Sequence, residues 1–127
     1  MQRFVFVLCL LAPSLALADR SINDSGVTTT IDCAKDPEVS MNGATGNLTF
    51  TGKCKKISIN GSTNTIKIES VEKLAVSGAN NTVTVDTAEK IGVTGSANTV
   101  AYKTGPNGKG KPKVSSVGVG NKITQVK

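Results

Sequence analysis

The chain has 127 residues, of which 15 are Lys or Arg, 9 are Asp or Glu and none is His, so its formal net charge is +6 at pH 7. This length suggests one domain at most. Without His the chain has no Ser–His or Cys–His nucleophile and no usual zinc site, so we expect neither catalysis nor a metal or other cofactor. Three Phe, one Tyr and no Trp are few large rings for a compact core. The composition therefore favours a thin core made of repeated small units.

Residues 1–18 have the pattern of a signal peptide. Arg3 supplies a short positive region, Phe4–Leu11 is an unbroken apolar run, and Ala16-Leu17-Ala18 has the small-x-small pattern that precedes cleavage. The apolar run is shorter than the roughly 20 residues that span a bilayer, which disfavours a membrane anchor. We therefore expect cleavage before Asp19, export to the periplasm or the extracellular space, and no membrane span in the mature chain.

Residues 19–38 are expected to form an N-terminal cap segment that includes the strand-like stretch Val27–Ile31. Cys33 lies in this segment, and Cys54 is the other cysteine of the mature chain. Two cysteines in an exported chain are most simply a disulfide, because that compartment is oxidising. Two buried thiols are the alternative, whereas a metal pair lacks further ligands. The disulfide would tie the cap to the first full repeat.

Residues 39–127 contain a repeat. The stretches 57–68, 74–85 and 91–102 align without a gap at a period of 17, from Ile57 to Leu74 and from Leu74 to Ile91. Degenerate copies precede them at an offset of 18 and follow them at an offset of 23, where a Lys/Gly/Pro-rich loop at 103–113 is inserted. Apolar residues at alternate positions predict two short half-buried strands per repeat. We therefore predict an all-β, single-domain β-solenoid of about five coils.

Two residue types recur at fixed places between the strands of each repeat. Gly permits a positive φ at a corner, and Asn tolerates left-handed geometry while it bonds nearby backbone. Stacked coils would place the asparagines about 4.8 Å apart, with their amides hydrogen-bonded along the stack. Neutral Asn in place of Asp at these corners argues against calcium. We assign a structural role to the corner glycines Gly61, Gly78, Gly95 and Gly118 and to an asparagine ladder of Asn64, Asn81, Asn98 and Asn121.

Several of these motifs resemble a known family. The similarity covers roughly residues 27–124, and the family is one of secreted bacterial domains of unknown function, catalogued as number three thousand and sixty. It implies a bacterial exported protein with a β-solenoid-like fold, and it implies no activity for any residue. The motifs that carry it are Asp32-Cys33, Gly52-Lys53-Cys54, the repeated hydrophobic-x-Val-x-Gly-x-x-Asn-x-hydrophobic units, Pro112-Lys113-Val114 and Gly120-Asn121.

The C-terminal part of the chain is basic, because no Asp or Glu follows Glu89. Such a charge can attract an acidic protein, an anionic glycan or another component of the cell envelope. Nucleic acid is not expected, since export argues against it and Tyr102 is the one aromatic residue of the basic part. A solvated face with a disordered loop is the alternative to a contact surface. The candidate contact patch comprises Lys103, Lys109, Lys111 and Lys113.

These features favour a structural or binding module without catalytic activity. A periplasmic inhibitor or immunity-type protein that neutralises an acidic exported partner is one alternative. A carbohydrate-active or anionic-glycan-binding solenoid is another, because Glu72 and Glu89 correspond in the repeat and a glycosidase needs a pair of carboxylates. Each of these acids is followed by a lysine, Lys73 or Lys90, so alternating surface charges explain the pattern more simply.

Overall fold

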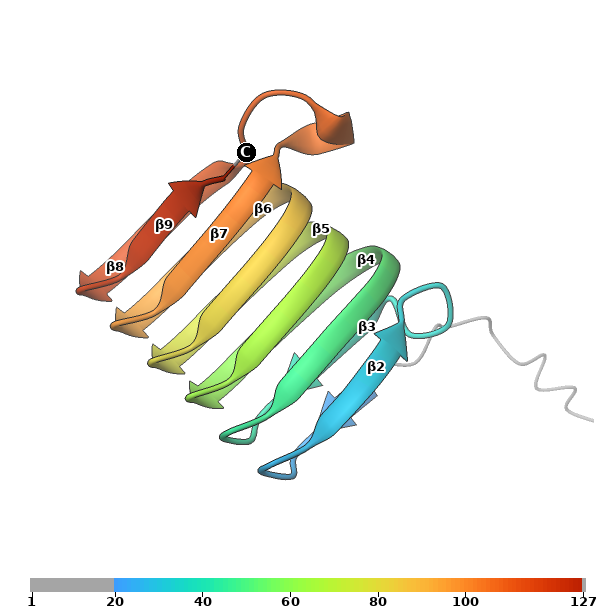
Figure 1. Cartoon of the computed structure of the whole chain (residues 1–127), viewed down its shortest axis with the longest axis vertical. Coiled ribbons are helices and arrows are strands. Elements are labelled where there is room, and N and C mark those ends of the chain that lie inside the picture. The colour runs from blue at the N-terminus through green and yellow to red at the C-terminus, as the bar shows by residue number, and fades with distance from the viewer. Residues whose placement is uncertain (1–19, 127) are drawn as a thin grey trace, which may run out of the picture.

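The structure, a computed structural model, describes residues 20–126 and consists almost entirely of stacked parallel strands (Figure 1). This arrangement confirms the predicted all-β solenoid. The predicted signal peptide, residues 1–18, lies outside the described residues. The elements are β1 (Arg20–Ile22), β2 (Thr28–Asp32), β3 (Glu38–Met41), β4 (Asn47–Ser62), β5 (Thr65–Ala79), β6 (Thr82–Ser96), β7 (Thr99–Thr104), the 3-10 turn η1 (Pro106–Gly108), β8 (Lys113–Val119) and β9 (Lys122–Gln125).

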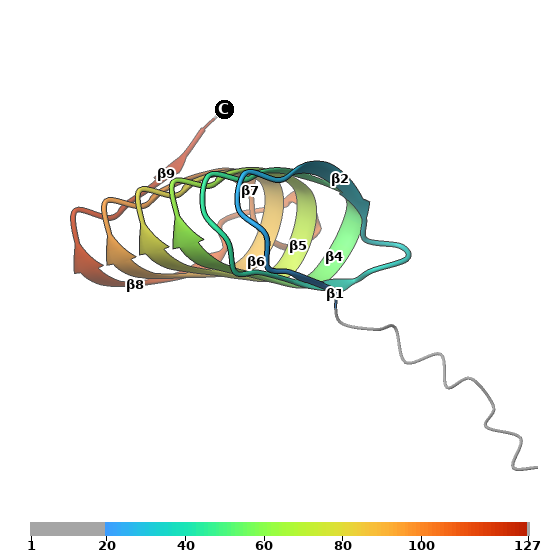
Figure 2. The same cartoon turned by 90° about the horizontal axis from the view of Figure 1, so that it is seen from below.

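The chain winds between two parallel layers of strands that face each other across the core (Figure 2). The first sheet contains β2, β7, β9 and the N-terminal halves of β4, β5 and β6. The second sheet contains β1, β3, β8 and the C-terminal halves of the same long strands. We expected two separate short strands per repeat. Instead, each long strand bends from the first sheet into the second, because pairing with the next coil continues through that corner, as at Val71 and Ala88.

Equivalent residues of successive repeats lie directly on top of one another. Paired residues of β5 and β6 have a constant separation along the sequence, which equals the period of the sequence repeat, as for Leu74 and Ile91. The offset of 18 in the first half of β4 has a local cause, since the register with β5 shifts between Phe50 and Lys53. Such a shift is a β-bulge that absorbs one extra residue. Gly52 in this bulge has a φ of +80°, which glycine adopts without strain.

The core consists of aliphatic columns enclosed between the two sheets. Val76 and Val93 are neighbours in one column of the second sheet, and each is 1% exposed. Ile66 and Val83 form the corresponding pair in the first sheet and are fully buried. Burying one such side chain stabilises the fold by about 1.5–3 kcal/mol. A single coil has few inward side chains, so its stability depends on the coils above and below it.

The solenoid begins earlier than the sequence repeat indicates. The pairing of β1 with β3 and of β2 with β4 makes residues 20–38 a stacked coil of their own. This coil is slightly longer than the regular repeat, because its pairs have an offset of 19, as for Arg20 with Val39. Two of its positions in register with core residues carry polar side chains. Arg20 pairs with Val39 but is exposed and forms an ion pair with Asp36, and Thr29 pairs with Leu48. Because of the longer offset and these polar residues, the sequence of this coil does not match the repeat.

The last coil also carries polar side chains in the core columns. Ser116 stands in the column of Val93, and Gln125 stands in that of Tyr102. Gln125 donates a hydrogen bond from Nε2 to the carbonyl oxygen of Lys103 at 3.0 Å. These polar residues replace core side chains at both ends of the described stack, as in the capping repeats of other solenoids. Val114, in the column of Ile91, is 44% exposed, so the last coil is only partly capped.

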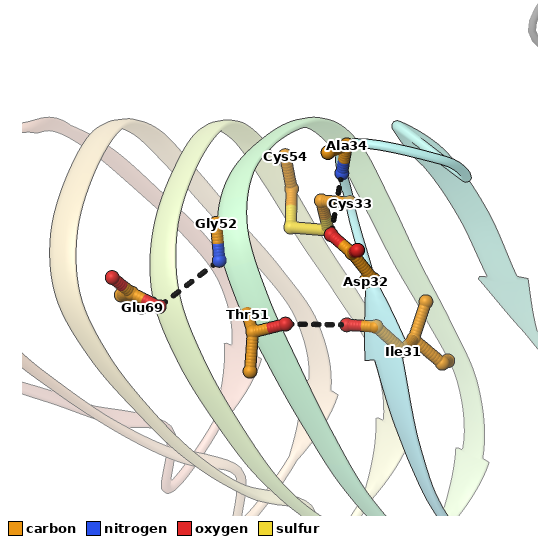
Figure 3. The surroundings of a disulfide bond; sticks show 8 residues. All are labelled: Ile31, Asp32, Cys33, Ala34, Thr51, Gly52, Cys54 and Glu69. Carbon is orange, nitrogen blue, oxygen red and sulfur yellow. Dashed lines mark hydrogen bonds between the residues drawn. A yellow bond between two sulfur atoms is a disulfide. The ribbon is translucent and has the colours of Figure 1, made fainter.

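Cys33 and Cys54 form the predicted disulfide, with a Cα–Cα distance of 4.9 Å (Figure 3). Cys54 occupies the corner column that continues with Val71 and Ala88, so the bridge replaces an aliphatic contact in that column. Cys33 follows β2 in the first coil, and its backbone N–H donates to the Thr51 carbonyl at 2.9 Å. The disulfide therefore fastens the first coil to the second.

Candidate functional site

The asparagine ladder lies inside the solenoid, at the corner that leads from the second sheet to the first. Asn64, Asn81 and Asn98 are fully buried. The Oδ1 atom of Asn81 accepts hydrogen bonds from the backbone N–H and the Nδ2 of Asn64, both at 3.1 Å. Its Nδ2 donates to the Gly61 carbonyl at 3.0 Å and to Asn98 Oδ1 at 3.1 Å. Asn121 accepts the same two bonds from Asn98, at 3.1 Å each. The amide groups form hydrogen bonds within the fold, so they are not available to an external ligand.

The left-handed backbone at this corner falls on the residue before each ladder asparagine. The angle φ is +59° at Thr63, +55° at Asn80 and +52° at Ala97. The expectation that the ladder asparagines themselves take the left-handed conformation is therefore wrong. Their side chains must point into the coil to bond its neighbours, so the preceding residue makes the turn although an L-residue is strained there. In the last coil that residue is Gly120, with a φ of +70°.

The predicted corner glycines also form a column. Their φ angles are +149° at Gly61, +123° at Gly78, +120° at Gly95 and +123° at Gly118. A Cβ atom at Gly78 would overlap the carbonyl oxygen of Gly61, and one at Gly95 would overlap that of Gly78. Successive coils therefore meet backbone to backbone at this corner, which requires glycine.

The four predicted contact lysines lie on three different elements. Lys103 is in β7 and forms an ion pair with Asp86 at 3.3 Å. Lys109 and Lys111 are exposed on the loop between β7 and β8. Lys113 begins β8 and belongs to the second sheet. Lys113 therefore has a different in-register neighbour from the other three, and this neighbour is Lys90.

The loop between β7 and β8 is folded. The backbone N–H of Gly105 donates to the Gly110 carbonyl at 3.0 Å, and that of Lys109 donates to the Pro106 carbonyl at 3.1 Å. Pro112 is buried at the end of the loop. These contacts hold the inserted residues against the corner of the solenoid, where η1 contacts β6.

Four lysines stand in register on the outer surface of the second sheet. Lys56 pairs with Lys73, Lys73 with Lys90, and Lys90 with Lys113, on β4, β5, β6 and β8 in turn. All four side chains are exposed. We call this set the lysine column. Sequence reasoning missed it, although the signal is present: a lysine directly precedes the first apolar residue of each repeat, at Ile57, Leu74, Ile91 and Val114.

Two further columns run beside the lysine column on the same surface, because every second residue of a strand faces the same side. The nearer one, the small-residue column, is Ser58, Ala75, Gly92 and Ser115. The next one, the polar column, is Asn60, Ser77 and Thr94, and its position on β8 is occupied by Val117, which is 63% exposed. At the N-terminal end of the lysine column the surface forms a depression of about 60 Å³, lined by Glu38, Val39, Ser40, Lys56 and Ser58. The small-residue column thus lies between the lysine column and the polar column, and we call this row of small side chains the trough.

Acidic residues lie at the margins of the lysine column. Glu38 pairs with Lys56 in register and so occupies the N-terminal end of the column. Glu72 and Glu89 each precede a column lysine at the corner and are partly buried. Glu89 lines a separate depression of about 280 Å³ toward the loop, together with Gly108. Within the part of the chain that the structure describes, neither Lys73 nor Lys90 forms an ion pair.

The first sheet has a different outer surface. An open depression of about 460 Å³ over β2, β4 and β5 is lined largely by threonines, among them Thr28, Thr49 and Thr65, and Lys67 is its one charged residue. Residues 20–126 contain no cluster of three or more His, Cys, Asp or Glu side chains placed to hold a metal ion. In the same range no helix is long and apolar enough to cross a membrane.

A family model described as "Protein of unknown function (DUF3060)" matches the sequence twice, at residues 41–85 and 71–120. Together the two matches extend from the end of β3 to the corner after β8, which is more than half of the chain. The chain belongs to this family. The resemblance inferred from the sequence motifs is thereby confirmed. The two matches overlap over residues 71–85, as the repeat allows. No curated protein and no solved structure matches the chain.

Proposed function

We propose that this member of the family is an exported protein that acts as a rigid binding module without catalytic activity. The leader-like residues 1–18 and the Cys33–Cys54 disulfide support export, because structural disulfides persist in oxidising compartments. Its partner is an anionic component of the cell envelope.

The lysine column is the observation that carries this proposal. Stacked repeats place identical side chains at a constant spacing on a flat surface, and solenoids use such extended surfaces for binding. Here the repeated side chain is a cation on four successive strands. A row of like charges attracts a partner of opposite charge over a long contact.

The test follows the full chain in a bacterial host and then the purified mature protein. We expect the intact mass of a chain that begins at Asp19, recovered from the periplasm or the medium. We expect the mature protein to sediment with isolated cell envelopes at low salt and to be released at high salt, since exposed charges are screened. Recovery of the uncleaved chain from the cytoplasm, or no sedimentation at any salt concentration, would overturn the proposal.

Protease treatment of the envelopes separates two kinds of anionic partner. Binding that survives the treatment assigns the partner to the glycan or lipid part of the envelope. Binding that is lost assigns it to an acidic protein, as an inhibitor or immunity-type role requires.

A further inference from the structure

We propose that the lysine column and its trough bind a linear anionic polysaccharide that lies along the solenoid axis, across the strands of the second sheet. This inference rests on the proposed binding function and names the site and the chemical class of the ligand.

The spacing of the charges is the first argument. Lys56, Lys73, Lys90 and Lys113 follow one another on neighbouring strands, which are about 4.8 Å apart. Like charges directly opposite each other in a sheet are unfavourable. No acid stands between these lysines in the column, so a chain that brings one negative charge to each strand relieves the repulsion along the whole row.

The small side chains of the trough are the second argument. Ala75 and Gly92 are central members of the small-residue column, between Ser58 and Ser115. With no long side chain there, a polymer can lie close to the backbone of the sheet and keep its anionic groups within reach of the lysines. The surface is built from paired strands, so little conformational freedom is lost on binding.

The polar column favours a sugar over other polyanions. Ser77 and Thr94 present hydroxyl groups on the far side of the trough, in register with Asn60. Asn60 Nδ2 donates to Asn42 Oδ1 at 3.1 Å. This hydrogen bond fixes the orientation of the Asn60 amide, so the Asn60 Oδ1 atom, an acceptor, points away from Asn42. A polymer with carboxylates on one edge and hydroxyls on the other matches both sides of the trough.

Nucleic acid fits this surface less well. Single-stranded nucleic acids are held by stacking of bases on exposed aromatic rings in addition to charge. Phe50 and Tyr102, the aromatic residues within the described range, are 1% and 7% exposed and belong to the core. The columns that form the trough offer hydroxyls and cations but no ring.

The experiment measures binding of polygalacturonate, a linear polymer of an acidic sugar, to the mature protein by titration calorimetry. We expect binding that weakens as salt rises, and no binding of an uncharged linear glucan. The double variant K73Q/K90Q should lower the affinity by about tenfold or more, because two ionic contacts are lost. Ala75→Gln should lower it as well, although it changes no charge, because its side chain fills the trough.

Two control variants remove positive charge elsewhere, and the second of them removes as many charges as K73Q/K90Q. Lys67→Gln neutralises a lysine on the first sheet, and the double variant K109Q/K111Q neutralises the loop. Both should bind polygalacturonate within about twofold of the parent protein, since neither touches the lysine column. Circular dichroism establishes that each variant is folded as the parent is.

The outcomes distinguish this inference from the function on which it rests. Unchanged polygalacturonate binding by K73Q/K90Q overturns the site. Equal binding of polyphosphate or single-stranded DNA, together with no effect of Ala75→Gln, overturns the ligand class and leaves a nonspecific polyanion surface. Salt-dependent binding to envelopes without binding to polygalacturonate overturns the inference while the proposed function stands.

Discussion

At the scale of single residues, the buried asparagines link one coil to the next. Each ladder amide has backbone and side-chain partners on neighbouring coils, so the loss of one amide leaves several buried groups without a partner. An unpaired buried polar group is far more costly than the net gain from one hydrogen bond. The ladder therefore makes the stacking of coils specific as well as stable.

Asn81→Ala is expected to destabilise the protein by about 3 kcal/mol or more, because it deprives the amide groups of Asn64 and the Gly61 carbonyl of their partners. Asn121→Ala is the matched control at the end of the ladder, where water reaches the half-exposed site, and it should lower stability by about 1 kcal/mol. Urea denaturation measures both values. Equal losses for the two variants would contradict the stacked ladder.

Ala97→Gly is expected to stabilise the protein by about 0.5–1 kcal/mol. The substitution removes the left-handed strain of the alanine backbone, and this strain is larger than the extra conformational entropy that glycine loses on folding. The N–H of residue 97, which donates to the Val119 carbonyl at 3.0 Å, is retained. Ala75→Gly serves as the control, because Ala75 lies within β5 and glycine should weaken the strand there. Thermal denaturation compares the two, and a lower melting temperature for Ala97→Gly would refute the strain argument.

At the scale of elements, small irregularities decide where the regular stack begins and ends. The bulge at Gly52 absorbs the one extra residue that separates the first half of β4 from the regular period. The insertion of residues 105–112 raises the offset to 23 without breaking the register of β6 with β8. The disulfide lies on the N-terminal side, where the first coil is longer than the regular repeat. The coil that departs most from the regular repeat at the N-terminal end is thus the one that receives a covalent link.

The double variant C33A/C54A is expected to lose about 3 kcal/mol, the value for a bridge that closes a loop with a sequence separation of 21 residues. A reducing agent should lower the free energy of unfolding of the parent protein by a similar amount. It should leave the free energy of unfolding of the variant unchanged. Guanidinium denaturation with and without reductant measures this. Insensitivity of the parent to reduction would show that the first coil is held mainly by its strand pairing.

Sequence patterns predicted the elements in the middle of the chain better than those at its ends. The gap-free period of the three central repeats was sufficient to predict the solenoid. There the strand register and the alternation of buried and exposed residues both repeat with the same period. The left-handed turn at Ala97 was missed, since no local preference of alanine favours it and the buried Asn98 imposes it. The lysine column was visible in the sequence, but Lys73 and Lys90 were interpreted as alternating surface charges with Glu72 and Glu89, because the column depends on which residues become neighbours on stacking.

At the scale of the whole molecule, the charge distribution that supports the proposed binding surface is expected to lower stability. The solenoid brings like charges together on the second sheet, whereas Lys67 on the first sheet has threonines as its in-register neighbours, Thr49 and Thr84. The same stacking that stabilises the core therefore produces repulsion on the surface.

Neutralising the column with the double variant K73Q/K90Q should raise stability by about 0.5–1 kcal/mol at low salt, since like-charge neighbours are removed. The gain should shrink as salt screens the charges. Lys67→Gln should change stability little at any salt concentration. Urea denaturation across a series of salt concentrations tests this, and a loss of stability in the double variant at low salt would mean that the column lysines have stabilising contacts.

The polar side chains at both ends of the stack, Arg20 and Thr29 in the first coil and Ser116 and Gln125 in the last, have a consequence for size. They reduce the apolar surface left open at the ends, although Val114 in a core column of the last coil is 44% exposed. The length of the outer surface is set by the number of repeats in the sequence. A relative with one more internal repeat would have one more position in each outer column, and under the binding proposed above it would contact a polymer one unit longer. The length of this surface thus changes by whole coils, each of them one period of the sequence.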